Sequence, residues 1–500
     1  MLQNRMMKTK ILHIAFLCLA FSTIGKAQID SSYIDMREEY QNFWEQALKE
    51  YNDFKKHAQT EFEQFLAEAW KEYEGFAATS GLYSKKKPET IPSIETSSGI
   101  IEVEAPSLFE TMPAFEEVEQ EQKDAFFDAK SSYLTDAVSV NFYGRPLDFR
   151  LPQNLRITAS GTRERQISKY YQTMRQNDAN QVLMKQLDAA VSQMGLNEWG
   201  YFALLRTIAE KIFDDTNDRV LFCFYMLHSR GFKARVARGS KSGNLQLLLA
   251  LDNKKEVYSL TYFRIRNTKF YIVYGNGQKG ESIYSYDEKA DDSGLKEIGL
   301  DFKKTLSITR CDKKRKLHLG KANLDIELPY SSAHLSYYDD IPTTVFPIYF
   351  KTAVANETEQ VLAETFGTLG KQYNKVQLVD IMLNFVQTAF AYKIDELQFG
   401  REKYFFPEEV IGRPFSDCED RSALFAWLVR HYIGYDVVGV LYDDHLATAI
   451  CFGNDAQIEG KSIMLHGKRY IICDPTYSNA SIGTVMPKFA NARYEIVEIN

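Results

Sequence analysis

Two distant stretches of this chain run through the same order of features. Residues 216–251 read TNDRVLFCFYMLHSRGFKARVARGSKSGNLQLLLAL, and residues 418–452 read CEDRSALFAWLVRHYIGYDVVGVLYDDHLATAICF. Each contains an Asp-Arg pair, an apolar stretch rich in aromatic residues, a glycine followed by an aromatic residue, and a β-branched stretch. The apolar stretch is typical of a buried helix, and the β-branched stretch is typical of a strand. The sequence therefore predicts one helix–strand unit that occurs twice.

The two copies differ at the positions that carry chemistry. An alignment through the Asp-Arg pairs is continued by matching VYSLTY (257–262) with ICDPTY (472–477). The second copy then has Cys418, His445 and Asp474 where the first has Thr216, Asn244 and Ser259. Because the first copy lacks these side chains, a shared fold does not by itself require them. We expect only the C-terminal copy to be equipped for catalysis.

The setting of Cys418 favours an activated thiol. Ser416 or Asp417 is a suitable N-cap for the helix that begins here, so Cys418 should lie in its first turn. A helix N-terminus and a neighbouring imidazole both lower a thiol pKa from its usual value near ~8.5. The backbone N–H groups of that first turn are also able to form part of an oxyanion hole. The alternative is a small buried cysteine at a helix start.

The spacing of His445 and Asp474 predicts a pair across two strands. His445 begins the strand HLATAICF and Asp474 ends the strand KRYIICD. If these strands pair antiparallel with His445 opposite Asp474, facing side chains lie ~5 Å apart at Cβ. The carboxylate would then fix the imidazole tautomer. The same register separates Cys451 from Cys473, so we expect no disulfide between them.

Three motifs resemble the bacterial transglutaminase-like superfamily, whose members share the core of papain-like cysteine proteases. They are SDCEDRSALFAWLV, YDDHLATAI and YIICDPTY, and the resemblance covers roughly residues 345–500. It implies an α+β fold with a Cys-bearing helix packed on an antiparallel sheet. It also implies that Cys418 is the nucleophile, His445 the general base and acid, and Asp474 the orienting carboxylate.

The same resemblance gives structural roles to neighbouring residues. Asp420 and Arg421 match a structural part of the motif. The segment DELQFGREKYFF (395–406) matches the stretch that leads into the catalytic helix, and Gln398 within it is a candidate for the oxyanion hole.

Two functions remain open at this point. The first is an exported cysteine-dependent amidohydrolase or acyltransferase that forms a thioester acyl-enzyme on peptide or Gln amides, with a protein or peptide as substrate. The second is a catalytically silent scaffold or protein-binding module of the cell envelope that uses the same fold. Neither needs a cofactor, and without CxxC or a Cys/His cluster at zinc spacing we expect no structural metal site.

The N-terminus predicts export. Lys8 and Lys10 precede the apolar stretch ILHIAFLCLAFSTI (11–24), which is too short for a transmembrane helix. Gly25 and Ala27 are small residues that suit a signal peptidase, so residues 1–27 are predicted to be a signal peptide. The mature protein is expected in the periplasm or outside the cell, and no later stretch is apolar enough to span a membrane.

A long amphipathic helix is predicted over residues 28–83. Aromatic residues recur every 11 positions, which gives a nearly straight stripe on a helix. They are Tyr40, Tyr51, Phe62 and Tyr73, followed by Phe43, Phe54, Phe65 and Phe76. Such a stripe should pack on the body of the protein or on a partner, including a second copy through residues 30–80.

The rest of the chain is predicted to be α+β. We expect a linker over 84–130, the copy lacking the triad over 131–275, a β-rich connecting region over 276–345, and the catalytic domain over 346–500. The formal net charge of −7 argues against a nucleic-acid partner. The short basic runs at 85–87 and 313–316 are expected to be solvated loops.

Overall fold

The computed structural model describes residues 46, 49, 50, 53, 60–77, 87, 92, 135–176, 179–252, 256–258, 260–286, 294–453 and 458–499. The predicted signal peptide and nearly all of the predicted linker lie outside these residues. The chain divides into two compact units, residues 1–64 and 65–500. In the first unit, the described residues are helical. All that follows on the sheets and the site concerns the second unit.

The helix predicted over 28–83 ends earlier than expected. Residues 60–67 are helical, but β1 (Lys71–Tyr73) and β2 (Phe76–Ala77) are strands. Tyr73 and Phe76 therefore continue the aromatic repeat without continuing the helix. The reason is tertiary: β1 pairs with β9 (Ile283–Ser285) and β2 pairs with β7 (Thr261–Ile265). Gly75 between them fits because a Cβ there would lie 3.0 Å from the Phe263 ring.

The first large sheet is antiparallel and has seven strands in the order β1-β9-β5-β6-β8-β7-β2. Its outermost strands, β1 and β2, are joined by two residues, so the sheet must curl until its ends meet. The remaining strands are β5 (Ala234–Gly239), β6 (Leu245–Leu249) and β8 (Thr268–Gly275). The sheet thus extends beyond the boundary at 275 that the sequence predicted.

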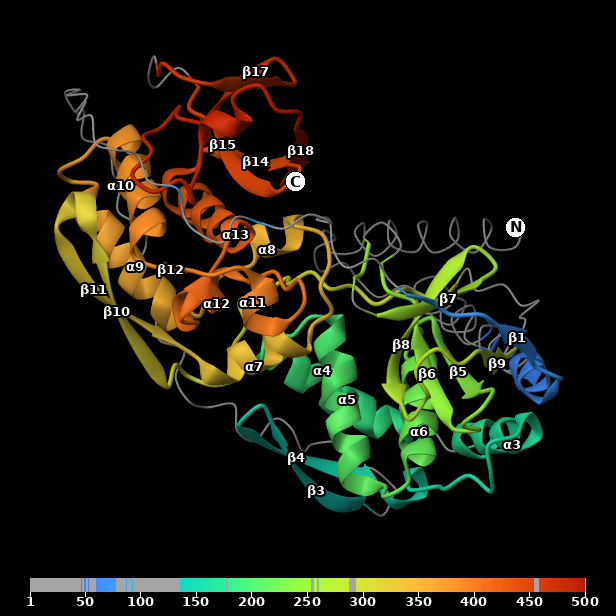
Figure 1. Ribbon diagram of the computed structural model, residues 1–500. Helices are drawn as coiled ribbons and strands as arrows, with labels where there is room; N and C mark the ends of the chain where they lie inside the picture. The colour runs from blue at the N-terminus through green and yellow to red at the C-terminus, as the bar shows by residue number, and fades with distance from the viewer. Residues whose placement is uncertain are drawn as a thin grey trace, which may run out of the picture. The chain divides into compact units, whose positions relative to one another are not determined.

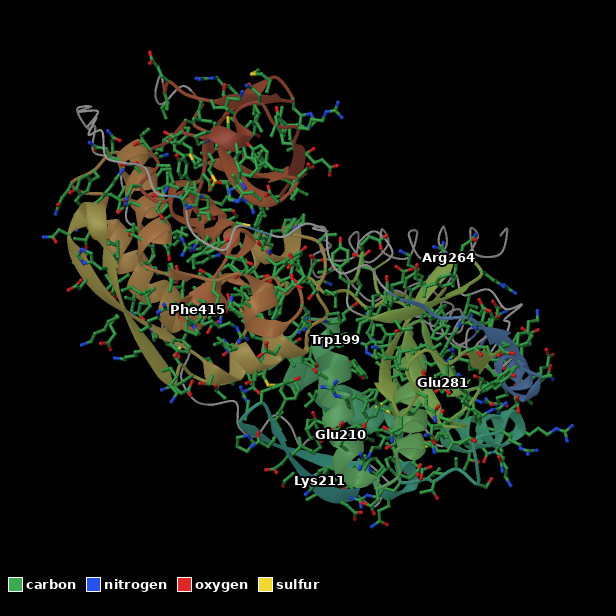
Figure 2. The ribbon with its side chains drawn as sticks, in the orientation of Figure 1. Trp199, Glu210, Lys211, Arg264, Glu281 and Phe415 are labelled. Carbon is green, nitrogen blue, oxygen red and sulfur yellow. The ribbon has the colours of Figure 1, made fainter. Side chains whose placement is uncertain are left out.

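Helices cover this sheet (Figure 1). Helix α6 (Thr216–Ser229) packs on β5 and β6 and is buried along most of its length. Before it lie α3 (Glu164–Arg175), α4 (Asn180–Gln193) and α5 (Glu198–Ile212), and before these the hairpin of β3 (Thr135–Phe142) and β4 (Arg145–Pro152) with the short η2 (Gln153–Leu155). Glu281, labelled in Figure 2, organises the approach to β9 by accepting N–H bonds from Lys241, Ser242 and Gln278.

The connecting region is only partly β-structured. The hairpin of β10 (Lys313–Leu319) and β11 (Leu324–Tyr330), with η4 (Gly320–Ala322) at its turn, agrees with the prediction. The following AHLSYY segment is helical instead, within α7 (Ser332–Asp340). The Ser331 hydroxyl caps this helix by accepting the His334 N–H, which favours a helix over a strand.

The C-terminal part of the chain is also α+β. Its five-stranded antiparallel sheet has the order β16-β17-β15-β14-β18. The strands are β14 (Asp436–Tyr442), β15 (His445–Cys451), β16 (Ser462–Leu465), β17 (Lys468–Cys473) and β18 (Glu495–Glu498). Helix α13 (Cys418–Leu428) packs on β15 and is buried on all sides.

Further helices and two short strands complete the C-terminal part. The helices are α8 (Pro347–Lys351), α9 (Asn356–Leu369), α10 (Lys375–Thr388), α11 (Asp395–Phe399), α12 (Pro407–Gly412), η5 (Val429–Ile433) and η6 (Pro487–Phe489). Strands β12 (Ala391–Tyr392) and β13 (Phe415–Ser416) pair parallel just before α13. Among the described residues, no helix is both long and apolar enough to cross a membrane.

The two sheets share one strand order. Five strands of the first run β9-β5-β6-β8-β7, and those of the second run β18-β14-β15-β17-β16. If the five strands of each sheet are numbered in chain order, both sheets have the order fifth, first, second, fourth, third. In the first sheet, α6 packs on β5 and β6, the two strands that follow it in the chain. In the second sheet, α13 packs in the same way on β14 and β15.

The Asp-Arg pair of each helix makes hydrogen bonds to the backbone of neighbouring segments. Asp218 accepts the Ala159 N–H at 2.8 Å, and Asp420 accepts the Phe405 N–H at 2.8 Å. Arg421 is fully buried and donates to the carbonyls of Gln387 and Phe390 in α10 and just beyond it.

We expect Arg421→Met to lower the free energy of unfolding by about 3 kcal/mol, because it strands buried carbonyls without donors. Arg219, the matched residue, is only partly buried and donates to the Phe213 carbonyl. Arg219→Met should therefore cost about 1 kcal/mol. Urea denaturation followed by circular dichroism measures both. Equal losses would contradict the bridging role of Arg421.

Candidate active site

His445 and Asp474 form a hydrogen-bonded pair. His445 Nε2 lies 2.8 Å from Asp474 Oδ2, and both side chains are buried. The register differs from the predicted one, because Thr448 pairs with Cys473 and Asp474 therefore follows on opposite Ala447. Since side chains alternate with period two, this shift keeps both residues on one face and leaves them diagonal neighbours. Alternating apolar residues fit either register, so the sequence specified the face only.

The carboxylate of Asp474 is held from its other side. Asp474 Oδ1 accepts the backbone N–H groups of Thr476 at 2.9 Å and Tyr477 at 3.1 Å. An ionised Asp474 carboxylate only accepts hydrogen bonds, so in that state the hydrogen of this bond lies on His445 Nε2. His445 Nδ1 is buried and has no hydrogen-bond partner among the described residues. The Phe489 ring stacks on the imidazole at 5.1 Å between centroids and fixes its plane.

Cys418 is the first residue of α13, as the sequence predicts. Asp420 caps this helix by accepting the Asp417 N–H at 3.1 Å. The backbone of Leu446, next to His445, acts to lower the pKa of Cys418 but does not outweigh the effect of burial. The sulfur's own partner is a carboxyl group, however: Cys418 Sγ lies 3.1 Å from Glu419 Oε2. No hydrogen bond joins Cys418 to His445 among the described residues.

The thiol of Cys418 is closed off from solvent, and its pKa is raised. Cys418 and His445 are 0% exposed and Asp474 is 1% exposed. Burial, and then the adjacent Glu419 charge, raises the pKa of Cys418 well above its ordinary value. The positive charge of Lys87 acts in the opposite direction but does not outweigh them. In this form the sulfur is protonated at neutral pH.

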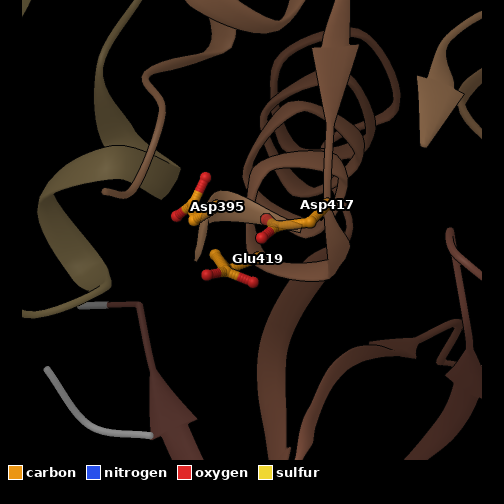
Figure 3. A group of neighbouring side chains, drawn as sticks. All are labelled: Asp395, Asp417 and Glu419. Carbon is orange, nitrogen blue, oxygen red and sulfur yellow. The ribbon is translucent and has the colours of Figure 1, made fainter. Parts of the chain in front are cut away.

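A cluster of acidic side chains surrounds the start of α13. Asp395, Asp417 and Glu419 bring one carboxylate oxygen each within 4.8 Å of one another (Figure 3). The ammonium of Lys87 lies among the acids, 2.9 Å from Asp417 Oδ2, 2.9 Å from Glu402 Oε1 and in contact with Glu419. Lys87 is therefore buried, contrary to the prediction that residues 85–87 form a solvated loop.

One ammonium does not balance all these carboxylates. Burial and like-charged neighbours raise the pKa of Asp395 well above its usual range and that of Glu419 to about 8. Burial by itself lowers the pKa of Lys87, but Asp417 and Glu419 outweigh it and raise that pKa well above 10.5. Carboxylate oxygens at this spacing are suited to a hard divalent cation, but Lys87 already fills the space with positive charge.

Gln398, the residue suggested for the oxyanion hole, makes a local contact: its side-chain N–H donates to the Lys393 carbonyl at 2.7 Å. Gln387, which sequence reasoning missed, donates to the Asp474 and Ala480 carbonyls at 2.9 and 3.0 Å. Because Arg421 bonds the Gln387 carbonyl, α10 ties the Cys418 helix to the strand end at Asp474. The five described cysteines are all free, including Cys451 and Cys473.

The segment that the sequence alignment matches to the Cys418 region has a hydrogen-bonded cluster at the start of its helix. Asn276 donates to the Thr216 hydroxyl at 3.1 Å, and Asn244 donates to the Asn276 carbonyl at 3.0 Å. Strand β8, which ends just before Asn276, occupies the position of β17 in the shared strand order. Asn276 therefore follows β8 as Asp474 follows β17. Ser259 itself lies outside the described residues.

An open hollow of about 350 Å³ lies elsewhere on this sheet. It is lined by residues at the far end of β15, among them Cys451, Phe452 and Lys468. His445 begins β15 and Cys451 ends it, so this hollow is remote from the histidine.

Comparisons with known proteins add no relative. No protein-family model matches the chain, and neither a curated protein nor a solved structure matches it.

The raised pKa of Glu419 predicts a pH-dependent stability. Its folded pKa of about 8 exceeds the ordinary 4.5, so protonation stabilises the fold below about pH 4.5 and this gain is lost as the pH rises through about 8. Glu419→Gln keeps the neutral form at every pH. Relative to this variant, the wild type should lose on the order of 2 kcal/mol between about pH 5 and pH 8.

Urea denaturation at a series of pH values measures this difference. Glu396→Gln, an exposed neighbour, serves as the control for removing one acid. A constant difference between wild type and Glu419→Gln across this pH range would contradict the assignment.

Proposed function

We propose that this protein is an exported, cysteine-dependent amidohydrolase or acyltransferase of the transglutaminase-like type, acting on peptide or Gln amides. The observation that carries the proposal is the His445–Asp474 pair, with a carboxylate fixed by two backbone donors and a buried Nδ1 that has no hydrogen-bond partner among the described residues. An imidazole held in one tautomer with its second nitrogen unoccupied suits a general base.

Cys418 is the nucleophile in this proposal. It stands at the N-terminus of α13, and this helix packs on β15, the strand that begins with His445. A helix N-terminus stabilises a thiolate and supplies backbone donors for an oxyanion. Activation requires the sulfur to exchange its contact with Glu419 for one with His445 Nδ1. The described form is then the resting state of the enzyme.

The reaction balances with the chain's own groups. His445 Nδ1 takes the thiol proton, and the Cys418 thiolate attacks the amide carbonyl carbon. As the C–N bond breaks, the imidazolium gives the proton to the leaving amine, and a thioester remains. Water or an amine, deprotonated by His445, then attacks the thioester and regenerates the thiol. Asp474 stabilises the imidazolium in both halves of the cycle.

The common strand order supports the idea of a duplicated unit. Thr216, Asn244 and Asn276 lie together in one copy through hydrogen bonds, without a nucleophile or a base. The same scaffold positions in the other copy hold Cys418, His445 and Asp474. Such a difference is expected if one copy kept the fold and the other carries the reaction.

A silent binding protein is the second candidate. The buried thiol, its raised pKa and its contact with Glu419 favour this alternative. In that case the fold of the C-terminal part is retained for its shape. The two functions differ in the reactivity of one sulfur atom.

Alkylation of the mature chain with iodoacetamide separates the two. Cys473 is a matched control, because it is also fully buried and burial also raises its pKa. If Cys418 is the nucleophile, its labelling at neutral pH should be at least about tenfold faster than that of Cys473. His445→Gln should reduce the Cys418 rate to that of Cys473, as measured by peptide mapping.

A melting curve shows whether His445→Gln is folded. Equal labelling of the two cysteines, unchanged in a folded His445→Gln variant, would exclude the enzymatic proposal and leave the silent binding protein.

A further inference from the structure

Lys87 lies close to the start of α13 although it is 330 positions from Asp417 in the sequence. Its ammonium is 4% exposed and lies between Asp417, Glu419 and Glu402. Glu419 is shared between the two groups, since one of its oxygens contacts Lys87 and the other contacts Cys418 Sγ. The space occupied by Lys87 is therefore separated from the sulfur by a single carboxyl group.

The shape of this pocket matches one kind of cation. A primary ammonium has three N–H donors, and the described ion pairs of Lys87 include those with Glu402, Asp417 and Glu419. A planar guanidinium presents its donors in a fixed fork and would not reproduce this arrangement. Asp417 Oδ1 and Asp395 Oδ1 are also buried and have no hydrogen-bond partner among the described residues. Without a cation, the pocket would hold several buried acids facing one another.

A second contact of the same segment lies near Asp474. The Pro92 carbonyl accepts the Ser478 backbone N–H at 3.2 Å. Ser478 follows closely after the strand end that carries Asp474. Two residues of one short stretch thus contact the two ends of the candidate site, one through an ammonium and one through the main chain. A bound peptide would use the same two kinds of contact.

We propose that the pocket between Glu402, Asp417 and Glu419 is a recognition subsite for the primary ammonium of a lysine side chain on the substrate, and that Lys87 fills it in this form. The substrate role rests on the proposed function, whereas binding of the ammonium does not. An amine held here stays protonated, because the surrounding carboxylates raise its pKa. It is consequently a recognition group and does not attack the thioester.

The test removes the internal occupant and offers a replacement. Lys87→Ala is made in the full mature chain, and N-acetyl-lysine N-methylamide is added as the probe. N-acetyl-norleucine N-methylamide is the neutral control. We expect the lysine amide to raise the melting temperature of Lys87→Ala by about 2 °C near ten times its dissociation constant, and the norleucine amide to have no effect. The wild type should not respond, because its own lysine competes at high effective concentration.

Two further variants make the result specific. Lys403→Ala removes another buried lysine, which pairs with Glu409 and Asp339 and has no bond to Glu419 among the described contacts. The lysine amide should not shift its melting temperature. Asp417→Asn in the Lys87→Ala background should abolish the shift, because Asp417 is an ion-pair partner of Lys87. If Lys87→Ala does not fold, Lys87→Met, which keeps the aliphatic stem, takes its place in the same assay.

The outcomes separate this subsite from the catalytic proposal. Equal effects of the lysine and norleucine amides, or the same shift in Lys403→Ala, would overturn the subsite. Repeating the assay with Cys418→Ala added should leave the lysine-dependent shift unchanged, because the sulfur does not contact the ammonium. A lysine-specific shift together with an unreactive Cys418 would support the subsite and reject the enzyme. A reactive Cys418 without a lysine-specific shift would support the enzyme and reject the subsite.

Discussion

The first turn of α13 brings more negative charge into the protein interior than the interior tolerates unaided. Asp417, Glu419 and Asp420 stand in one turn, and Asp395 adds a further carboxyl group. Buried carboxylates must be paired, protonated or hydrogen-bonded, and all three solutions occur here. Asp420 accepts two backbone N–H groups, Lys87 contacts Asp417 and Glu419, and burial raises the pKa of Glu419 to about 8. The thiol shares this environment.

This charge balance couples the reactivity of Cys418 to a distant residue. Glu419 raises the pKa of the sulfur, whereas Lys87 lowers it. Loss of Lys87 without a replacement would therefore leave the thiol still less acidic, while a substrate ammonium in the same pocket would preserve the balance. A cationic substrate would thus take over the charge that Lys87 supplies, and the thiol would still need the contact with His445 to ionise.

Much of the site was predictable from local patterns, and its surroundings were not. Ser416 or Asp417 as N-cap before an apolar run predicted where α13 begins, and antiparallel pairing of the two strands predicted that His445 and Asp474 share a face. The strand register was off by two residues because alternation has period two. Lys87 was missed because a basic run in a Pro- and Ser-rich stretch gives no sign of a distant acidic pocket. The acids around Cys418 were the available signal, since Arg421 alone does not balance them.

The two aligned segments share some contacts and differ in others. Asp218 and Asp420 each accept a hydrogen bond from an upstream backbone N–H. Thr216 and Asn244 are half-buried and Asn276 is exposed, whereas Cys418, His445 and Asp474 are fully enclosed. Asn217 stands where the second copy has Glu419, and it accepts the Leu245 N–H. The enclosed side chains and the excess of acids are thus found in the segment with the thiol. The buried acids lower the stability of the fold, and the first sheet has the same strand order without them.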